Sequence, residues 1–109
     1  QYPATVNHVA ETDFARRVLG EVVGAKNVLD FRPTMGAEDF SYFLQAIPGC
    51  YFLIGNGDGE HREGGHGLGP CMLHNPSYDF NDDLIPLGGS AWVRIAEAWL
   101  AGPLRGASR

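Results

Sequence analysis

An α/β fold is predicted for this chain by the alternation of helical and extended patterns along its 109 residues. Apolar residues recur at helical spacing in three stretches, and short extended patterns separate them, giving the order helix, strand, helix, strand, helix. One more extended stretch, residues 1–7, opens the chain without a hairpin turn that would supply a neighbouring strand. We therefore expect the chain to be a piece of a larger protein.

The first helix is expected to run from Asn7, which can cap it, to about Val23. Its apolar stripe comprises Phe14, Val18, Leu19 and Val22. Gly24 is a natural stop for this helix, because glycine readily adopts the backbone conformation that ends one. Residues 27–31 then resemble a short strand.

The second helix is expected from about Ala37 to Ala46. Glu38 and Asp39 in its first turn would complement the positive end of the helix dipole. The predicted buried face comprises Phe40, Phe43, Leu44 and Ile47. Residues 50–54 are apolar without interruption between two glycines, which is typical of a strand buried on both faces.

A long loop is expected from Asn56 to about Asn81, and its part from Gly57 to Gly69 is rich in glycine. The last helix should begin near Asp82 or Asp83, which would cap it or charge its first turn. The predicted buried face of this helix comprises Leu87, Ala91, Trp92, Ile95 and Trp99. Residues 103–109 are expected to form a tail.

The composition excludes several functions. Apolar residues make up 44% and charged residues 19% of the chain, as in soluble globular proteins. A net charge of −5 with scattered basic residues argues against a nucleic acid or an anionic membrane as partner. No apolar run is long enough to span a membrane. Two cysteines do not form a disulfide framework, so a reducing, cytoplasmic location is expected.

His74 lies in the stretch LHNPSYDFNDD, whose proline, asparagine and aspartate residues exclude regular structure. Pro76 has a fixed φ and biases Asn75 away from the helical region, so His74 is expected on a constrained loop. A rigidly held imidazole suits a metal site or a proton-transfer site, although a solvated or hydrogen-bonded histidine has the same pattern. Asp79, between two aromatic residues, could orient this loop as an indirect partner of a metal site.

Two other sites are open to interpretation. Cys71 and His74 have the spacing C-x-x-H and, with His61 and His66, could form a self-contained zinc site; a buried thiol and two solvated histidines are the alternative. The turn 34–37 precedes a helix whose amide groups could bind an anion, provided that the neighbouring carboxylates point away. No nucleophile with its base is evident, so the chain alone is expected to be inactive.

The segments PTMGAEDFSYFL, PGCYFLIGNG and LHNPSYDFNDD, together with the opening YPATVN, resemble one known family along nearly the whole chain. It is the metal-dependent aminoacylase and carboxypeptidase family, in its branch of hippurate hydrolases and indole-acetyl-amino-acid hydrolases. The resemblance implies an amidohydrolase that cleaves N-acyl amino acids in the cytoplasm, with a catalytic α/β domain interrupted by a lid domain that often dimerises. An inactive relative and a stand-alone zinc-binding or interaction module are the alternatives.

The resemblance also assigns residues. Residues 1–7 would be the strand returning from the lid, and residues 8–102 the C-terminal part of the catalytic domain. His74 matches the last ligand of two divalent ions, commonly zinc, manganese or nickel. The other ligands and the glutamate general base would lie in an N-terminal half outside this sequence, so the piece alone should hold no metal tightly. Met35, Gly36 and Ala37 match a loop that lines the substrate pocket.

Overall fold

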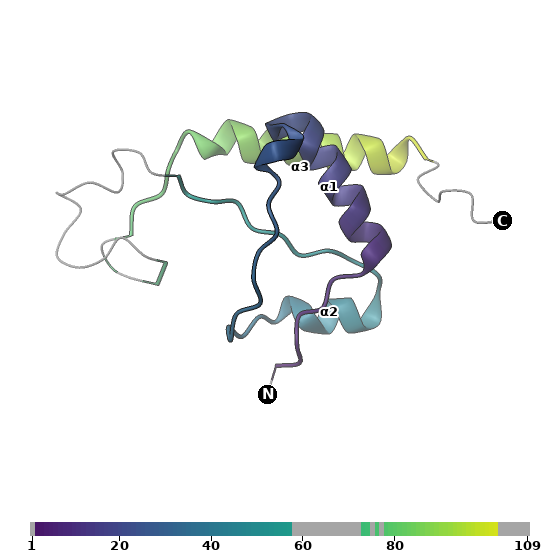
Figure 1. Cartoon of the computed structure of the whole chain (residues 1–109), viewed down its shortest axis with the longest axis vertical. Helices are drawn as coiled ribbons and strands as arrows, with labels where there is room; N and C mark the ends of the chain where they lie inside the picture. The colour runs from purple at the N-terminus through teal and green to yellow at the C-terminus, as the bar shows by residue number, and fades with distance from the viewer. Residues whose placement is uncertain (1, 58–72, 75, 77, 103–109) are drawn as a thin grey trace. The chain divides into compact units, whose positions relative to one another are not determined.

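The computed structural model describes residues 2–57, 73, 74, 76 and 78–102. Its helical elements, drawn in Figure 1, are α1 (Val9–Val23), the 3₁₀ helix η1 (Ala25–Asn27), α2 (Phe40–Ala46) and α3 (Leu84–Leu100). The chain divides into two compact units. Unit 1 comprises Gln1–Leu53 with Ser90–Arg109, and unit 2 comprises Ile54–Gly89.

Helix α1 begins and ends close to where the sequence predicts, but its N-terminal cap is different. His8 occupies the cap position, and no side chain caps the helix there. The prediction that Asn7 caps α1 is wrong, because the Asn7 amide bonds instead to Tyr51. Gly24 ends the helix with φ of +84°, in the region that favours glycine, which confirms the predicted stop.

A small apolar core holds unit 1 together. Its buried members are Phe14, Ala15 and Val18 of α1, Leu44 of α2 and Ala91 of α3. The Phe14 ring also packs edge-on against Trp99 of α3, with ring centroids 5.4 Å apart. The helical periodicity of the sequence therefore identified correctly the face of α1 that is buried.

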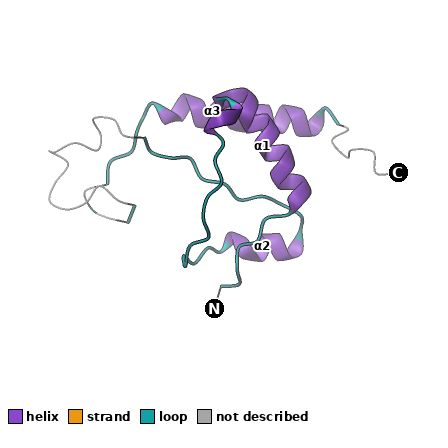
Figure 2. Ribbon diagram, viewed as in Figure 1, coloured by secondary structure: helices purple, strands orange, loops and turns teal. Residues whose placement is uncertain are grey.

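The predicted strands are not observed in the described residues. As Figure 2 shows, residues 2–57 contain helices and loops but no strand, and Asn27 belongs to η1 rather than to a strand at residues 27–31. A strand requires a neighbouring backbone with which to exchange hydrogen bonds. In residues 50–54, the N–H and C=O of Tyr51 bond to a side chain, that of Asn7. The α/β class is accordingly not confirmed by this structure.

Several residues of the predicted buried faces are exposed. Leu53 and Ile54, expected in a strand covered on both faces, are 59% and 46% exposed. Large apolar side chains are likewise exposed on the predicted inner faces of α2 and α3: Phe43, Ile47, Trp92 and Trp99. Apolar surface of this kind is typical of interfaces. The prediction is nevertheless right for Leu44 of α2 and Ala91 of α3, which lie on the same predicted faces and are buried.

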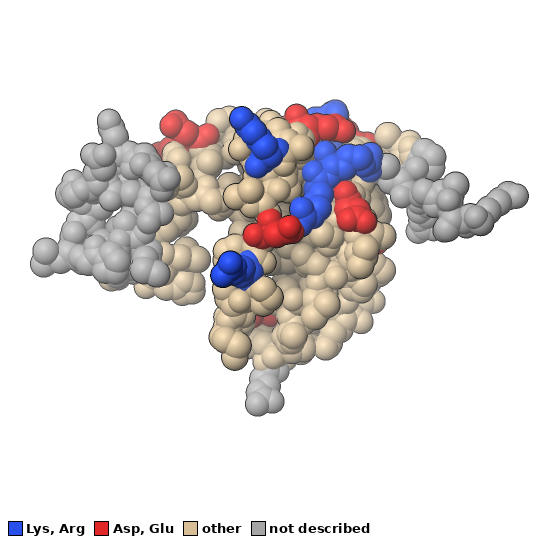
Figure 3. Space-filling view, in the orientation of Figure 1, with Lys and Arg blue, Asp and Glu red and all other residues tan. Residues whose placement is uncertain are grey.

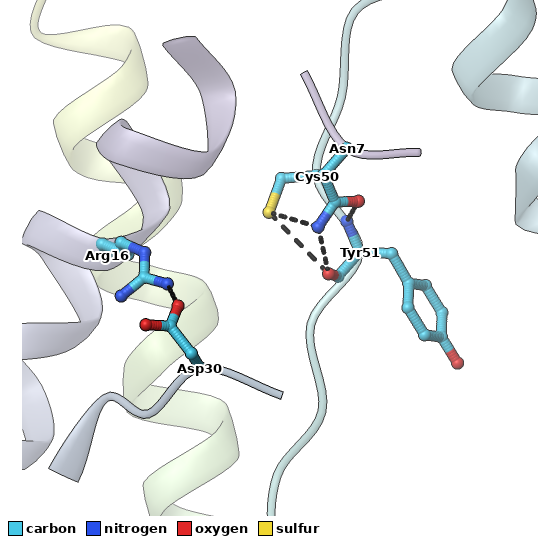
Figure 4. A network of polar contacts seen from close by, with 5 residues as sticks. All are labelled: Asn7, Arg16, Asp30, Cys50 and Tyr51. Carbon is cyan, nitrogen blue, oxygen red and sulfur yellow. Dashed lines mark hydrogen bonds and ion pairs between the residues drawn. The ribbon is translucent and has the colours of Figure 1, made fainter. Parts of the chain in front are cut away.

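The segment Gly49–Tyr51 joins the start of α1 to α2. Asn7 accepts a hydrogen bond from the Tyr51 N–H and donates one to the Tyr51 carbonyl, both at 2.8 Å (Figure 4). His8 and Gly49 form a second reciprocal pair: the His8 N–H donates to the Gly49 carbonyl, and the Gly49 N–H donates to His8 Nδ1. On the side of α2, a Cβ added at Gly49 would lie 3.1 Å from Leu44 Cδ2, so a larger residue would displace Leu44.

Charged side chains of both signs lie side by side on the face shown in Figure 3. Arg16 pairs with Asp30, as Figure 4 shows. Arg94 of α3 bonds to Glu97 and to Glu21 of α1, and these contacts raise the pKa of Arg94. All these groups are at least partly exposed, so the pairs contribute little stability.

No described helix is long and apolar enough to cross a membrane.

Candidate functional site

His74 has an unusual backbone conformation. Its φ is +69°, and among the residues that the structure describes it is the one non-glycine residue with a positive φ. The residue lies in a turn and is exposed, which agrees with the predicted loop. For an L-residue this left-handed region is less favourable than the right-handed one by about 1–2 kcal/mol. Such residues are frequent at functional sites, where the surrounding structure holds them in place.

The side chain of Asn56 joins the two ends of the long loop in unit 2. Asn56 Nδ2 donates to the Asp79 carbonyl at 2.8 Å, and Asn56 Oδ1 accepts from the Asn81 N–H at 3.0 Å. A third bond runs in the opposite direction: Asn81 Nδ2 donates to the Asn56 carbonyl at 3.2 Å. We call these three bonds the Asn56–Asn81 clamp. Sequence reasoning missed it, since Asn56 was predicted only as the place where the loop begins.

Asn81 also forms the start of α3. Its Oδ1 accepts a hydrogen bond from the Asp83 N–H at 3.1 Å, and its carbonyl accepts from the Leu84 N–H at 3.0 Å. Helix α3 begins at Leu84, close to the predicted start. The Asn81 side chain bonds at this start, and capping by Asp82 or Asp83 stays a prediction. Asparagine side chains are among the most favourable at helix starts. This signal was therefore present in the sequence, one residue before the expected Asp82.

The Asp79 backbone, rather than its side chain, makes the contact with Asn56. Asp79 is half-buried next to an aromatic pair in which the Tyr78 and Phe80 rings meet edge-on, with centroids 4.8 Å apart. The described part of the His74 loop is thus anchored on its C-terminal side by a hydrogen bond and by ring packing. A role for the Asp79 carboxylate in orienting the loop remains a prediction.

The start of α2 is already occupied by a carboxylate of the chain itself. Glu38 Oε1 accepts from the Phe40 N–H at 3.1 Å, and the Glu38 and Asp39 carbonyls accept from the Ser41 and Tyr42 N–H groups. The prediction of an anion site here required that the carboxylates point away, and Glu38 does not. The predicted helix start at Ala37 is also wrong, because α2 begins at Phe40.

Glu38 also connects α2 to the segment around Tyr51. Its second oxygen, Oε2, accepts a hydrogen bond from the Tyr51 hydroxyl at 2.9 Å, and the Phe40 ring packs on that of Tyr51. The bonds from the Phe40 N–H and the Tyr51 hydroxyl lower the pKa of Glu38. The same contact with the Glu38 carboxylate raises the pKa of Tyr51. The bond therefore needs Glu38 ionised and Tyr51 protonated.

Removing the Tyr51 hydroxyl is expected to raise the pKa of Glu38 towards its ordinary value. In Tyr51→Phe the ring contact remains, and so does the Phe40 bond, so the pKa should recover only in part. Because the folded protein lowers the pKa of Glu38, the stability from this bond is lost as the pH falls through that lowered pKa, and Tyr51→Phe should lessen this loss. NMR titration of the Glu38 carboxyl measures the shift, with Tyr2→Phe as control; identical titrations in both variants would contradict the assignment.

Met35, Gly36 and Ala37 lie outside any helix, on an exposed stretch that leads to Glu38. The Met35 side chain is fully exposed. The bonds of Glu38 to α2 and to Tyr51 fix the end of this stretch. The three residues are therefore accessible to a substrate, and their contact with one remains a prediction.

The described residues contain no group of three or more histidine, cysteine, aspartate or glutamate side chains that could hold a metal ion. Cys71, His61 and His66, the other members of the alternative zinc site, lie outside the described residues, as do residues 58–69 of the glycine-rich part of the loop. His74 itself suits a ligand, because its imidazole is exposed on a constrained turn. It can supply one ligand of a site that other residues would have to complete.

Comparison with known proteins identifies the family. The sequence profile of peptidase family M20/M25/M40 matches residues 1–98. The chain therefore belongs to this family, which confirms the resemblance inferred from its motifs. The match covers α1, α2, most of α3 and the segment that carries His74.

Relatives with named activities agree with this family. The chain is 33% identical over 99 residues to IAA-amino acid hydrolase ILR1-like 4 of Arabidopsis thaliana, a match that covers 91% of this chain and 21% of the relative. It is 35% identical over 97 residues to thermostable carboxypeptidase 1 of Saccharolobus solfataricus, covering 87% and 22%. It is 32% identical over 99 residues to hippurate hydrolase of Campylobacter jejuni, covering 90% and 23%.

The chain thus spans about a fifth of the length of the curated relatives it matches. No solved structure matches it.

Proposed function

We propose that this chain is the C-terminal part of a metal-dependent amidohydrolase that cleaves the amide bond of N-acyl amino acids, as a hippurate hydrolase does. The family and the names of its relatives support this class of reaction. The observation that carries the proposal is His74, exposed on a turn with φ of +69°. A histidine that is held in an unfavourable backbone conformation and remains accessible is suited to a ligand role.

The chain would contribute three things to the reaction. His74 would hold one of two divalent ions (zinc, manganese or nickel) through an imidazole nitrogen. Such ions, when bound, lower the pKa of a water molecule and polarise the amide carbonyl. The backbone at Met35, Gly36 and Ala37 would contact the carboxylate of the substrate, and Asp79 would help to orient the His74 loop. The glutamate general base and the other ligands would lie outside this sequence.

In the complete enzyme, further structure would surround this chain. Residues 1–7 would be the strand that returns from a lid domain through which the enzyme forms a homodimer, and residues 8–102 would complete the catalytic domain. The exposed apolar side chains on Leu53, Ile54 and α3 support an interface with further structure. The isolated chain would be inactive and would hold no metal tightly, and the complete enzyme would be cytoplasmic.

The alternative is a stand-alone zinc-binding or interaction module that uses Cys71, His74, His61 and His66. The relatives' activities favour the hydrolase, since they are named as enzymes about five times longer than this chain. An inactive relative kept for assembly would retain the fold without turnover.

The proposal is tested by assaying the complete enzyme on N-benzoylglycine and on the unacylated dipeptide glycylglycine, with Zn²⁺, Mn²⁺ or Ni²⁺ supplied. We expect amino-acid release from the N-acyl substrate to exceed release from the dipeptide at equal concentrations, and a chelator to stop it. No release from N-benzoylglycine with any of the three ions would contradict the proposed reaction. Preference for the dipeptide would assign the enzyme to peptide cleavage instead.

A further inference from the structure

We infer that Asn56 is a positioning residue for His74, which acts through the Asn56–Asn81 clamp and sets the affinity of the metal site to which His74 contributes. This inference rests on the proposed function, in which His74 is a metal ligand. It adds to that function a residue that touches neither the metal nor the substrate.

The clamp is a specific pairing of amide groups rather than a chance contact. Asn56 directs its donor at a carbonyl, that of Asp79, and its acceptor at an N–H, that of Asn81. Rotating the amide by half a turn would set donor against donor and acceptor against acceptor, so one orientation alone satisfies both partners. The returning bond from Asn81 Nδ2 to the Asn56 carbonyl makes the pairing reciprocal.

The clamp fixes the chain close to His74. Asp79, which accepts the Asn56 bond, lies five residues after His74 (79 minus 74). Five residues span at most about 18 Å when fully extended, so fixing Asp79 limits where His74 can lie. Asn81 continues the restraint into α3, because it caps the start of that helix. The segment that follows His74 is thus held by the bonds to Asn56 and by the start of α3.

The backbone conformation of His74 makes its position sensitive to loss of the clamp. A residue with φ of +69° relaxes to an ordinary backbone conformation unless the surrounding structure prevents it. Relaxation would turn the imidazole away from its position. Partners that orient a ligand typically change metal affinity by about 10–100-fold when they are removed. Because Asn56 acts through the backbone of the loop, we expect a change near the lower end, about tenfold.

The test uses the complete enzyme, freed of metal and titrated with Co²⁺, whose visible absorption reports the geometry of its ligands. Asn56→Ala is expected to weaken Co²⁺ binding about tenfold and to alter the absorption spectrum, with unchanged helix content by circular dichroism. Asn81→Asp serves as the conservative variant. It sets a carboxylate oxygen against the Asn56 carbonyl but keeps the acceptor that caps α3, so it should weaken Co²⁺ binding without removing the start of α3.

The matched control is Asn27→Ala. The Asn27 side chain also donates to a backbone carbonyl, that of Val23, at 2.6 Å, but Asn27 lies in η1, in unit 1. We expect its Co²⁺ affinity and spectrum to equal those of the wild type. If Asn56→Ala binds Co²⁺ as the wild type does, or if Asn27→Ala loses as much affinity, the inference is overturned.

A variant with His74 replaced separates this inference from the proposed function. If the wild type binds Co²⁺ tightly and His74→Ala does not, the metal role of His74 stands, and the result for Asn56→Ala decides the clamp alone. If His74→Ala binds Co²⁺ like the wild type, the proposed ligand role fails, and the clamp inference fails with it.

Discussion

Replacing His74 by alanine is expected to reduce the turnover of N-acyl amino acids by the complete enzyme to background. The imidazole would be lost as a metal ligand, and alanine offers no substitute. Removing a residue that merely orients a ligand lowers metal affinity or activity by about 10–100-fold. Removing the ligand itself should therefore lower the activity more than a hundredfold. The rate of hydrolysis of N-benzoylglycine at saturating metal measures this effect. Near-normal turnover would show that His74 is not a ligand.

Cys71→Ala is the control that distinguishes the two metal sites proposed for this region. If His74 serves a site completed by residues outside this sequence, Cys71→Ala should keep its turnover. If the two residues belong to one self-contained zinc site, both variants should lose metal together. The two accounts thus predict opposite results for the same pair of variants.

Val18→Asp is expected to unfold the part of the protein built on α1. Val18 is 1% exposed in the core of unit 1, on the face of α1 on which Phe14 and Ala15 are also buried. A carboxylate there would have to be buried without a partner or neutralised by protonation, and either is costly. We expect a loss of at least about 4 kcal/mol in the free energy of unfolding, which is a large part of the stability of a typical domain. Urea unfolding followed by circular dichroism measures the change.

Ala10→Asp is the matched control for this variant. Ala10 lies in the first turn of the same helix and is exposed. A carboxylate near a helix N-terminus is favourable, so this variant should keep its stability. Equal destabilisation by both substitutions would mean that charge on α1, rather than burial of Val18, determines the effect.

The sequence predicted best the features that depend on local pattern. The spacing of Phe14 and Val18 identified the buried face of α1, and Gly24 identified its end, because helical periodicity and positive φ are properties of a short stretch of chain. The position of His74 on a loop followed from the proline and asparagine beside it. These are features that neighbouring residues determine.

Features that depend on distant residues were missed. Asn7 was expected to cap α1, yet its amide bonds to Tyr51, and Asn56 bonds to Asn81 across the long loop. No local pattern distinguishes an asparagine that caps a helix from one that pairs with a distant backbone. The strand at residues 50–54 was predicted from its apolar run alone, but a strand also requires a neighbour, which the described residues do not supply.

Metal content tests the central claim most directly. The complete enzyme, purified and dialysed against metal-free buffer, would be analysed by mass spectrometry of its elements as the wild type, His74→Ala and Cys71→Ala. We expect close to two divalent ions per chain in the wild type and in Cys71→Ala, and a clear loss of bound metal in His74→Ala. Equal metal content in the wild type and His74→Ala would contradict the claim that His74 holds a metal ion in a hydrolytic site.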